Sequence, residues 1–403
     1  MLAEQNPYSP GSGRRPPELV GRTGELEAFD TLRARVASGR GDRGVVLTGL
    51  RGVGKTVLLN EMYRMAESFE WLTVRIEARR DEAGVHAVRR ALARGLMASS
   101  RKLARTTLSS RMRGALGTIS SFNAKVGATG IELGVELSQG RADSGDAEVD
   151  LLELVEDVSL ALGERRRAFG VFIDEMQDLD SETMGALIAA QHLANQQDWP
   201  FYIIAAGLPN LPRVLTETRS YAERLFNYRQ IGKFSREEAA RALRDPAERL
   251  GAKFAPDALD VLLDAADGYP YFIQEYGQAV WNLSPEAFIE PSDAVAAVRH
   301  GTEQLDGGFF RSRWQRATRS ERRMLRAMAA DGEGPSSTAV VAQRMEIQPS
   351  SVGPYRAALI SKGLVYAPEH GQVAFTVPGM AGYVERHHED IDDASGTSIS
   401  SDR

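Results

Sequence analysis

The segment Gly49–Thr56, GLRGVGKT, constrains the fold of this chain more than any other, because it fits the pattern G-x-x-x-x-G-K-[ST] at every fixed position. The run before it, Gly44–Thr48 (GVVLT), has the continuous apolar character of a buried parallel strand. After it, apolar residues recur at helical spacing from Val57 to Met65. Strand, glycine-rich turn and helix are the context that a phosphate-binding loop requires. The alternative is a chance glycine-rich connection between a strand and a helix.

Each residue type in this loop has a physical task. Glycines let the backbone curl so that successive N–H groups point at phosphate oxygens, and a helix that starts near Lys55 adds the positive end of its dipole. Lys55 would bring its charge to the β- and γ-phosphates, and the Thr56 hydroxyl would ligate Mg²⁺. The expected cofactors are therefore ATP and Mg²⁺, and the residues expected to hold them are Gly49, Leu50, Arg51, Gly52, Val53, Gly54, Lys55, Thr56 and Val57.

A second acidic motif follows a later apolar run, in the segment Val171–Glu175 (VFIDE). Asp174 is expected to hold the Mg²⁺ shell, and Glu175 to orient and polarise an attacking water. The plainer reading is an acidic pair at a strand end that caps the next element. Asp178 and Asp180 are expected to be exposed or to cap the following helix.

The wider pattern alternates buried apolar strands with amphipathic helices, which predicts an α/β fold with a parallel sheet covered on both faces. We expect a three-layer αβα P-loop NTPase domain over residues 18–233, with an insertion at about 79–150. Within the insertion, Ser121–Leu137 alternates as a hairpin does. Arg89–Arg113 holds eight cations and no acid, and suits a nucleic-acid-facing surface, a solvated helix or a face that pairs with acidic partner residues.

Four segments, in this order along the chain, carry a resemblance to known proteins: Leu19–Leu26 (LVGRTGEL), Asp174–Gln177 (DEMQ), Glu223–Phe226 (ERLF) and Gly268–Pro270 (GYP). They resemble the V-G-R-x-x-E-L box, the D-E-x-Q form of the acidic motif, the arginine-finger box and the lid G-x-P signature of AAA+-related ATPases. Within that group, the chain is most similar to the origin-recognition-type initiator ATPases and the STAND signalling ATPases, over about Leu19 to Trp281.

The resemblance implies further site residues. Val20, Gly21 and Arg22 would lie near the adenine or ribose, and Pro270 would close a lid over the base. Arg224 would stabilise charge on the γ-phosphate, in its own subunit or from a neighbour in a homo-oligomer. The plainer readings are that Arg224 is a surface residue and that Pro270 only starts a helix.

Two departures from the family pattern favour a slow nucleotide switch over fast hydrolysis. The expected fourth strand ends in Ala206–Gly207 without a polar sensor at its tip, and Asn210 is the substitute at hand. No arginine follows Gly268 closely enough to act as a second sensor. A switch needs only a difference in binding energy between two arrangements.

After residue 233 the sequence pattern changes. It predicts a helical lid domain, residues 234–308, followed by a winged helix-turn-helix domain, residues 309–388. Arg311–Arg386 holds eleven Lys and Arg against six Asp and Glu, a net of +5, in a chain whose total is −6. In a winged helix the third helix, here residues 350–362, enters the major groove of double-stranded DNA. Base-edge candidates are Ser350, Ser351, Tyr355 and Arg356, and phosphate candidates are Lys362, Arg322 and Arg323.

Composition excludes several classes. With no cysteine, the chain has no disulfide, no cysteine-ligated metal and no cysteine nucleophile, which fits a cytoplasmic protein. No apolar run is long enough to span a membrane, and the six histidines lack metal-ligand spacing. Residues 1–17 are expected to be a disordered lead and residues 389–403 a disordered acidic tail.

These observations predict an ATP- and ADP-binding switch that is coupled to DNA binding by its C-terminal domain. The alternative is a nucleotide-controlled signalling or oligomerisation protein whose winged domain docks a protein. A small-molecule kinase is disfavoured, because Glu175 suits the activation of water and no acceptor pocket is legible.

Overall fold

The computed structural model describes residues 1–11, 13–79, 90–98, 110–125 and 141–387 of the chain. It divides into two compact units, which we describe separately. The sheet unit comprises Gly21–Gly49 and Gly54–Gly232. The helical unit comprises Met1–Val20, Leu50–Val53 and Lys233–Arg403.

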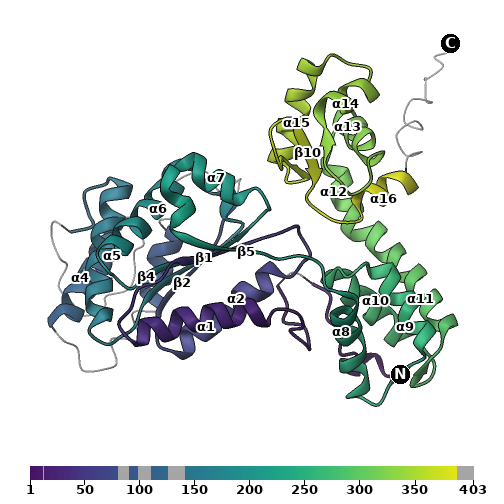
Figure 1. Ribbon diagram of the computed structural model, residues 1–403, viewed down its shortest axis with the longest axis horizontal. Helices are drawn as coiled ribbons and strands as arrows, with labels where there is room; N and C mark the ends of the chain where they lie inside the picture. The colour runs from purple at the N-terminus through teal and green to yellow at the C-terminus, as the bar shows by residue number, and fades with distance from the viewer. Residues whose placement is uncertain (12, 80–89, 99–109, 126–140, 388–403) are drawn as a thin grey trace, which may run out of the picture. The chain divides into compact units, whose positions relative to one another are not determined.

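The sheet unit is built on five parallel strands in the order β2-β3-β4-β1-β5 (Figure 1). The strands are β1 (Gly44–Thr48), β2 (Leu72–Glu77), β3 (Phe169–Asp174), β4 (Phe201–Gly207) and β5 (Phe226–Gln230). Every residue of β1, β3 and β4 is buried, which explains why their sequences are nearly continuous apolar runs. The parallel α/β fold expected from the sequence is confirmed.

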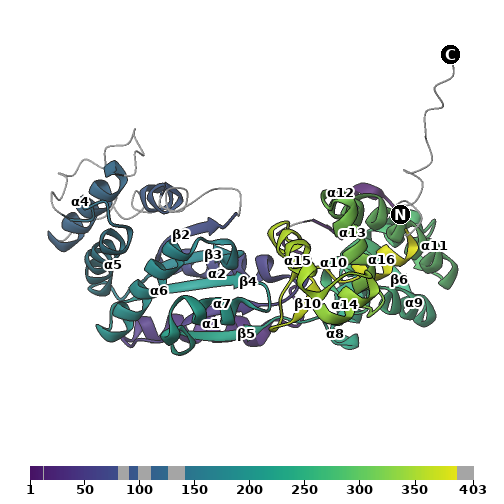
Figure 2. The ribbon, with the colours of Figure 1, turned by 90° about the horizontal axis from the view of Figure 1, so that it is seen from above.

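Helices cover both faces of this sheet (Figures 1 and 2). One face carries α1 (Thr23–Ala37) and α2 (Lys55–Ser68), and the other carries α5 (Ala147–Gly163), α6 (Ser181–Gln196) and α7 (Leu211–Thr218). The short 3₁₀ turns η2 (Met176–Asp178) and η3 (Ser220–Arg224) follow β3 and α7. Because all strands run the same way, the segments after β1, β3 and β4 gather at one edge of the sheet.

The insertion differs from the expected hairpin where the structure describes it. Residues Ser110–Lys125 form helix α4, which packs on α5, so the start of the segment expected to be a hairpin, residues 121–125, is helical. The reason is that Ile119 and Phe122 continue the buried stripe of Met112, Ala115 and Leu116 at helical spacing. The rest of the expected hairpin, residues 126–137, and residues 89 and 99–109 of the basic stretch lie outside the described residues.

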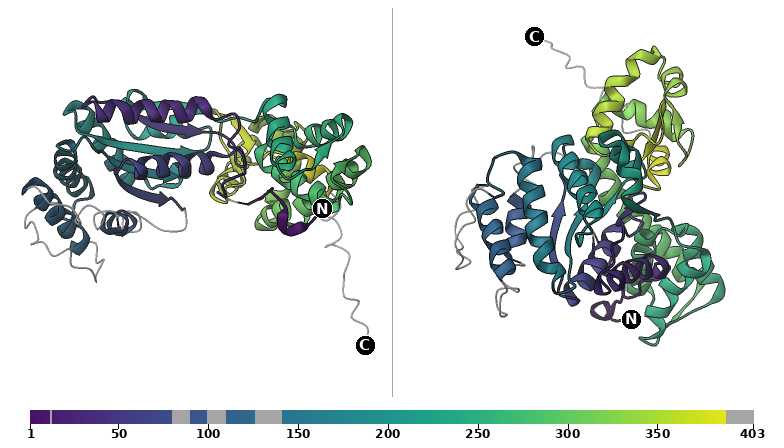
Figure 3. Two further views of the ribbon diagram at one scale, coloured as in Figure 1. Left: turned by 90° about the horizontal axis from the view of Figure 1, so that it is seen from below. Right: turned by 60° about the vertical axis from the view of Figure 1, so that its left-hand side comes forward.

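The helical unit begins with four helices and a small parallel two-stranded sheet, seen from two further sides in Figure 3. The helices are α8 (Arg236–Glu248), α9 (Pro256–Ala266), α10 (Pro270–Leu283) and α11 (Pro291–Gln304), and the strands are β6 (Lys253–Phe254) and β7 (Phe288–Ile289). Prolines at the first positions of α9, α10 and α11 suit helix starts, because their missing N–H has no partner there.

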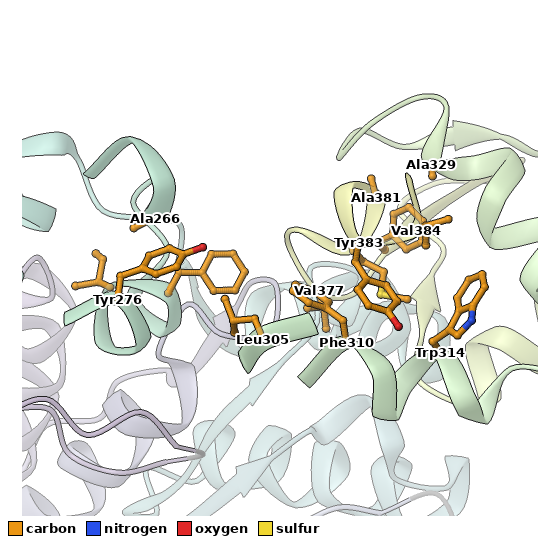
Figure 4. Close-up of a cluster of buried hydrophobic side chains, with 14 of the residues drawn as sticks. Ala266, Tyr276, Leu305, Phe310, Trp314, Ala329, Val377, Ala381, Tyr383 and Val384 are labelled. Atoms are coloured by element: carbon orange, nitrogen blue, oxygen red, sulfur yellow. The ribbon is translucent and has the colours of Figure 1, made fainter. Parts of the chain in front are cut away.

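Helix α11 passes without a break through a π-helical turn, η4 (Leu305–Phe310), into α12 (Arg311–Arg316). Aromatic side chains anchor this rod to the end of the C-terminal region (Figure 4). Phe310 stacks on Tyr383 with ring centroids 5.4 Å apart, and Trp314 meets the edge of the same ring at 6.3 Å. Asp306, within the π turn, accepts two hydrogen bonds from the guanidinium of Arg386 at 2.7 and 2.9 Å.

The C-terminal region contains three helices, α13 (Arg319–Ala329), α14 (Thr338–Arg344) and α15 (Val352–Ser361). A three-stranded antiparallel sheet, ordered β8-β10-β9, joins them, with β8 (Ser336–Ser337), β9 (Val365–Tyr366) and β10 (Gln372–Phe375). The final helix is α16 (Met380–Arg386). Ser350 and Ser351 belong to a 3₁₀ turn, η5 (Pro349–Ser351), ahead of α15.

The first residues differ from the expected disordered lead, because they pack on α8 and α10. Tyr8 is 2% exposed, and its hydroxyl donates a hydrogen bond to the carbonyl of Leu243. The indole N–H of Trp281 donates to the carbonyl of Leu2 at 2.9 Å. Burial raises the pKa of Tyr8, so this hydroxyl stays a donor. The expected tail, residues 389–403, lies outside the described residues. Of the helices described, none combines the length and the apolarity needed to cross a bilayer.

Candidate functional site

The loop between β1 and α2 has the backbone conformation that its glycines predict. Gly52 and Gly54 adopt positive φ angles of 87° and 93°, a region that side chains disfavour. Gly54 is the N-cap of α2, so the helix starts at Lys55 with its N-terminal dipole end at the loop. The N–H of Gly49 donates to the carbonyl of Gly207 at 3.1 Å, which ties the start of the loop to the end of β4.

Thr56 and Asp174 meet at the centre of the candidate site, although 118 residues separate them. The Thr56 hydroxyl donates to Asp174 Oδ2 at 2.7 Å, and the N–H of Glu175 donates to Asp174 Oδ1 at 3.0 Å. Asp174 is 7% exposed and Lys55 is 6% exposed, so the charged groups are largely removed from water. One hydroxyl and one carboxylate are hard oxygen donors, the kind of ligands that Mg²⁺ takes together with water and phosphate oxygens.

The electrostatics of Asp174 also fit a cation. Burial raises the pKa of this carboxyl most, and the charge of Glu175 raises it further. The hydrogen bonds from Thr56 and the Glu175 N–H, and the charge of Lys55, lower the pKa, but the net direction is upward. A buried carboxylate of this kind gains stability from a positive ion beside it.

Glu175 is held in an unusual way. Its backbone is left-handed, with φ 51° and ψ 42°, a conformation that costs a residue with a side chain about 1–2 kcal/mol. The Gln177 side chain donates from Nε2 to Glu175 Oε2 at 2.6 Å and accepts at Oε1 from the N–H of Leu208 at 3.1 Å. Gln177 thus joins the candidate base to the end of β4.

The sequence alone does not indicate these hydrogen bonds of Gln177, which appears there only as part of the D-E-x-Q pattern. In the folded structure Gln177 lies against Gly207, the last residue of β4. A Cβ added at Gly207 would collide with Gln177 Oε1. Asn210, the expected sensor substitute, lies at the N-cap of α7, and its Oδ1 is buried without a hydrogen-bond partner among the described residues.

The resemblance-based residues fall into two groups. In the sheet unit, Arg22 is 8% exposed and donates from its guanidinium to the carbonyls of Gly21 and Gly232 at 3.2 and 2.8 Å, so it braces backbone. Arg224 is exposed at the end of η3, and no carboxylate lies within 4 Å of it in the described chain.

The remaining residues belong to the helical unit. Val20 is 9% exposed and part of its apolar core, and Pro270 is the first residue of α10, so their proposed contacts with the base stay predictions. Arg51, grouped with this unit, donates from its N–H to the carbonyl of Thr376 at 2.9 Å and from its guanidinium to that of Gly363 at 3.0 Å.

All three residues expected to contact phosphates in the C-terminal region have partners within that region. Lys362 pairs with Glu321 at 2.5 Å, and Arg323 donates to the carbonyl of Met345 at 3.0 Å. Arg322 donates to the carbonyl of Trp314 and lies over its ring. Of the base-edge candidates, Ser350 and Ser351 are exposed, whereas Tyr355 and Arg356 are half-buried.

No metal-binding group of three or more His, Asp or Glu side chains occurs in the described ranges. The described part of the basic stretch includes Arg111, which pairs at 3.1 Å with Glu164, the C-cap residue of α5. Asp180 caps α6 by accepting from the N–H of Thr183 at 2.8 Å, as expected.

The comparisons with known proteins agree with this geometry. Residues 18–204 match the family model of the AAA ATPase domain, and residues 307–384 match that of a domain of unknown function, DUF8462. Among curated proteins, none matches this chain.

Three solved structures are similar to this chain to different degrees. The Walker-type ATPase PABY2304 of Pyrococcus abyssi is 16% identical with a TM-score of 0.55, over 92% of this chain and 97% of that chain. The Aeropyrum pernix Orc1 protein, in complex with DNA, is 16% identical with a TM-score of 0.45, over 93% and 94%. The Thermotoga maritima RuvB Holliday junction branch migration motor is 14% identical with a TM-score of 0.45, over 89% and 95%.

Proposed function

We propose that this chain, whose residues 18–204 form an AAA ATPase domain, is a nucleotide-dependent switch that binds ATP with Mg²⁺ and hydrolyses it slowly. The observation that carries the proposal is the buried contact between the Thr56 hydroxyl and Asp174, beside Lys55 and at the start of α2. A hydroxyl, a carboxylate and a lysine that converge on a helix N-terminus suit a polyphosphate and its metal ion.

The roles of the residues follow from their chemistry. The loop residues from Gly49 to Val57 would bind the phosphates through main-chain N–H groups, and Lys55 would add its charge at the β- and γ-phosphates. Thr56 and Asp174 would hold Mg²⁺, which supplies neutralisation of the phosphate charge when bound. Glu175 would orient a water molecule and take its proton as that water bonds to the γ-phosphorus and the bond to ADP breaks.

Assembly is part of this proposal. Arg224 is exposed and has no acidic partner in the described chain, so its guanidinium is available to a neighbouring copy. A guanidinium that meets the γ-phosphate of a neighbour would make hydrolysis depend on a homo-oligomer. Val20, Gly21, Arg22 and Pro270 are proposed to line the base and ribose, as the resemblance to the AAA+ and STAND proteins implies.

The experiment that tests the nucleotide site is the Lys55→Ala variant. Loss of a charged hydrogen-bond donor worth about 1.5–3 kcal/mol should weaken ATP binding by about 10- to 10²-fold. Fluorescence titration with a labelled ATP analogue measures the change. Lys253→Ala, which removes an exposed lysine of β6, is the matched control and should bind as the wild type does. Equal affinity of Lys55→Ala and Lys253→Ala would refute the site.

For the C-terminal region we propose a winged helix-turn-helix that contacts double-stranded DNA. Its three helices, its three-stranded sheet and the exposure of Ser350 and Ser351 support this reading. The second candidate, a protein-docking module in a STAND-like switch, is favoured by one observation: Lys362, Arg322 and Arg323 already have partners within the region.

A further inference from the structure

We infer that Gln177 is a positioning residue, which fixes the Glu175 carboxylate for water activation and couples it to the turn between β4 and α7. The inference deepens the proposed ATPase function and rests on it. It assigns a task to a polar side chain that bridges the acidic motif and the tip of β4, where the sequence shows no polar sensor.

Gln177 makes a hydrogen bond at each end of its side-chain amide. An amide side chain has a donor end and an acceptor end, and here each end has one well-formed partner. The Nε2 donor reaches a carboxylate oxygen of Glu175 at 2.6 Å, within the short range of charge-assisted bonds. The Oε1 acceptor receives the N–H of Leu208 at 3.1 Å. A leucine of similar size would keep neither bond.

The backbone of Glu175 and the glycine at the end of β4 both suit this pair of hydrogen bonds. The left-handed backbone of Glu175 is followed at once by η2, in which the N–H of Asp178 donates to the carbonyl of Glu175 at 2.8 Å. This tight turn brings Gln177 back toward the strand end. Gly207 leaves room for the amide oxygen, because a Cβ there would occupy the same space. Strained backbone with a matched glycine is typical of a constrained functional position.

The hydrogen bond to Leu208 connects Gln177 to the turn that leads into α7. Leu208 begins the turn into α7, where the N–H of Leu211 donates to the carbonyl of Leu208 at 2.9 Å. Helix α7 leads directly into η3, which ends at Arg224. A displacement of η3, such as docking of a neighbouring copy would cause, can therefore reach the Glu175 carboxylate through α7, Leu208 and Gln177. A base oriented by a third group is better placed to accept a proton than a freely rotating one.

Two substitutions separate the two hydrogen bonds. Gln177→Leu removes both, and Gln177→Glu keeps an acceptor for the Leu208 N–H while it replaces the donor to Glu175 with a second negative charge. For both variants we expect kcat for ATP hydrolysis to fall by about 10- to 10²-fold, the scale of a misplaced catalytic group. The affinity for a labelled ATP analogue should stay within about threefold, because Gln177 is not in the phosphate-binding loop.

The split between kcat and ATP affinity distinguishes positioning from general support of the fold, because a positioning residue acts on turnover and not on binding. Gln191→Leu is the matched control, since Gln191 also hydrogen-bonds strand β4, at Phe201 and Ile203 at the opposite end of that strand. It should lower the melting temperature without the fall in kcat that we expect for the Gln177 variants.

The outcomes are distinct. If Gln177→Leu hydrolyses ATP within about twofold of the wild type, or if Gln191→Leu reproduces its fall in kcat with retained ATP affinity, the inference is overturned. If the wild type binds ATP but shows no turnover that Glu175→Gln abolishes, the proposed hydrolysis fails, and the inference fails with it. Reduced kcat with retained ATP affinity in both Gln177 variants, and not in Gln191→Leu, supports the assignment.

Discussion

Asp174 is a carboxylate that the sheet unit holds out of water before any cation is present. It accepts from Thr56 and from the Glu175 N–H, yet burial still raises its pKa. An acid with a folded-state pKa above the unfolded value loses stability as pH rises, because the unfolded chain ionises more readily. The buried Asp174 carboxylate therefore lowers the stability of the folded protein by a small amount, and a bound metal ion would offset this loss.

We therefore predict that, with no ligand added, the Asp174→Asn variant is more stable than the wild type. The asparagine can still accept from the Glu175 N–H, and the Thr56 hydroxyl can turn to accept from its amide. We expect a gain of about 0.5–2 kcal/mol at pH 7 in urea unfolding, together with loss of Mg²⁺-dependent ATP binding.

The sign of the pH dependence is fixed. Below the unfolded pKa of about 3.9, Asp174 is protonated in both the folded and the unfolded state, so the stability gained by Asp174→Asn vanishes. This gain grows as pH rises through the higher pKa of Asp174 in the folded state. Asp257→Asn, which changes an exposed carboxylate of α9, should show no such growth. A gain that stays constant with pH would contradict the explanation.

At the scale of elements, the N-terminal segment is fastened to the helical unit by the fit of Tyr8 against Gly277. A Cβ at Gly277 of α10 would lie 2.5 Å from Tyr8 Cδ1, so only glycine lets the ring approach the helix. Local composition could not predict this, since Tyr8 stands among Pro, Ser and Asn, and the partner of its hydroxyl is 235 residues away.

We predict that Gly277→Ala destabilises the protein by about 1–3 kcal/mol, because overpacking against Tyr8 outweighs the better helix propensity of alanine. Gly353→Ala is the matched control: Gly353 lies in α15, and its added Cβ would meet nothing within 4 Å. That variant should be stabilised by up to about 1 kcal/mol. Urea unfolding measures both. Stabilisation by Gly277→Ala would mean that Tyr8 does not occupy this place.

At the scale of the whole molecule, most of what depends on local pattern was predictable. Strands β1, β3 and β4 follow nearly continuous apolar runs, and the order of loop, acidic motif and helices follows the chain. The exceptions are informative. The alternation in Ser121–Leu137 predicted a hairpin, but its first residues continue the buried face of α4. The bridge by Gln177 depends on Gly207, which only the folded sheet brings near. Contacts between segments distant along the chain are what pattern alone does not contain.

The coupling to nucleic acid is a property of the whole chain and has a quantitative signature. If the full-length protein binds double-stranded DNA through phosphates, the logarithm of its association constant should fall linearly with the logarithm of salt concentration, with a slope of about −0.9 per phosphate contacted. Fluorescence anisotropy with and without ATP and Mg²⁺ measures this slope and its dependence on nucleotide. The alternative, a protein-docking region, expects no binding at moderate salt.

The π-helical turn at Leu305–Phe310 has a consequence for how such chains can diverge. A π turn holds one residue more than the α-helical turn it replaces, and this one contains two adjacent glycines, Gly307 and Gly308. Since each α-helical residue contributes a rotation of about 100° and a rise of about 1.5 Å, loss of one glycine would re-aim everything beyond α12 in a single genetic event. The π turn thus sets the direction in which α12 leaves α11, although the helix runs through it without a break.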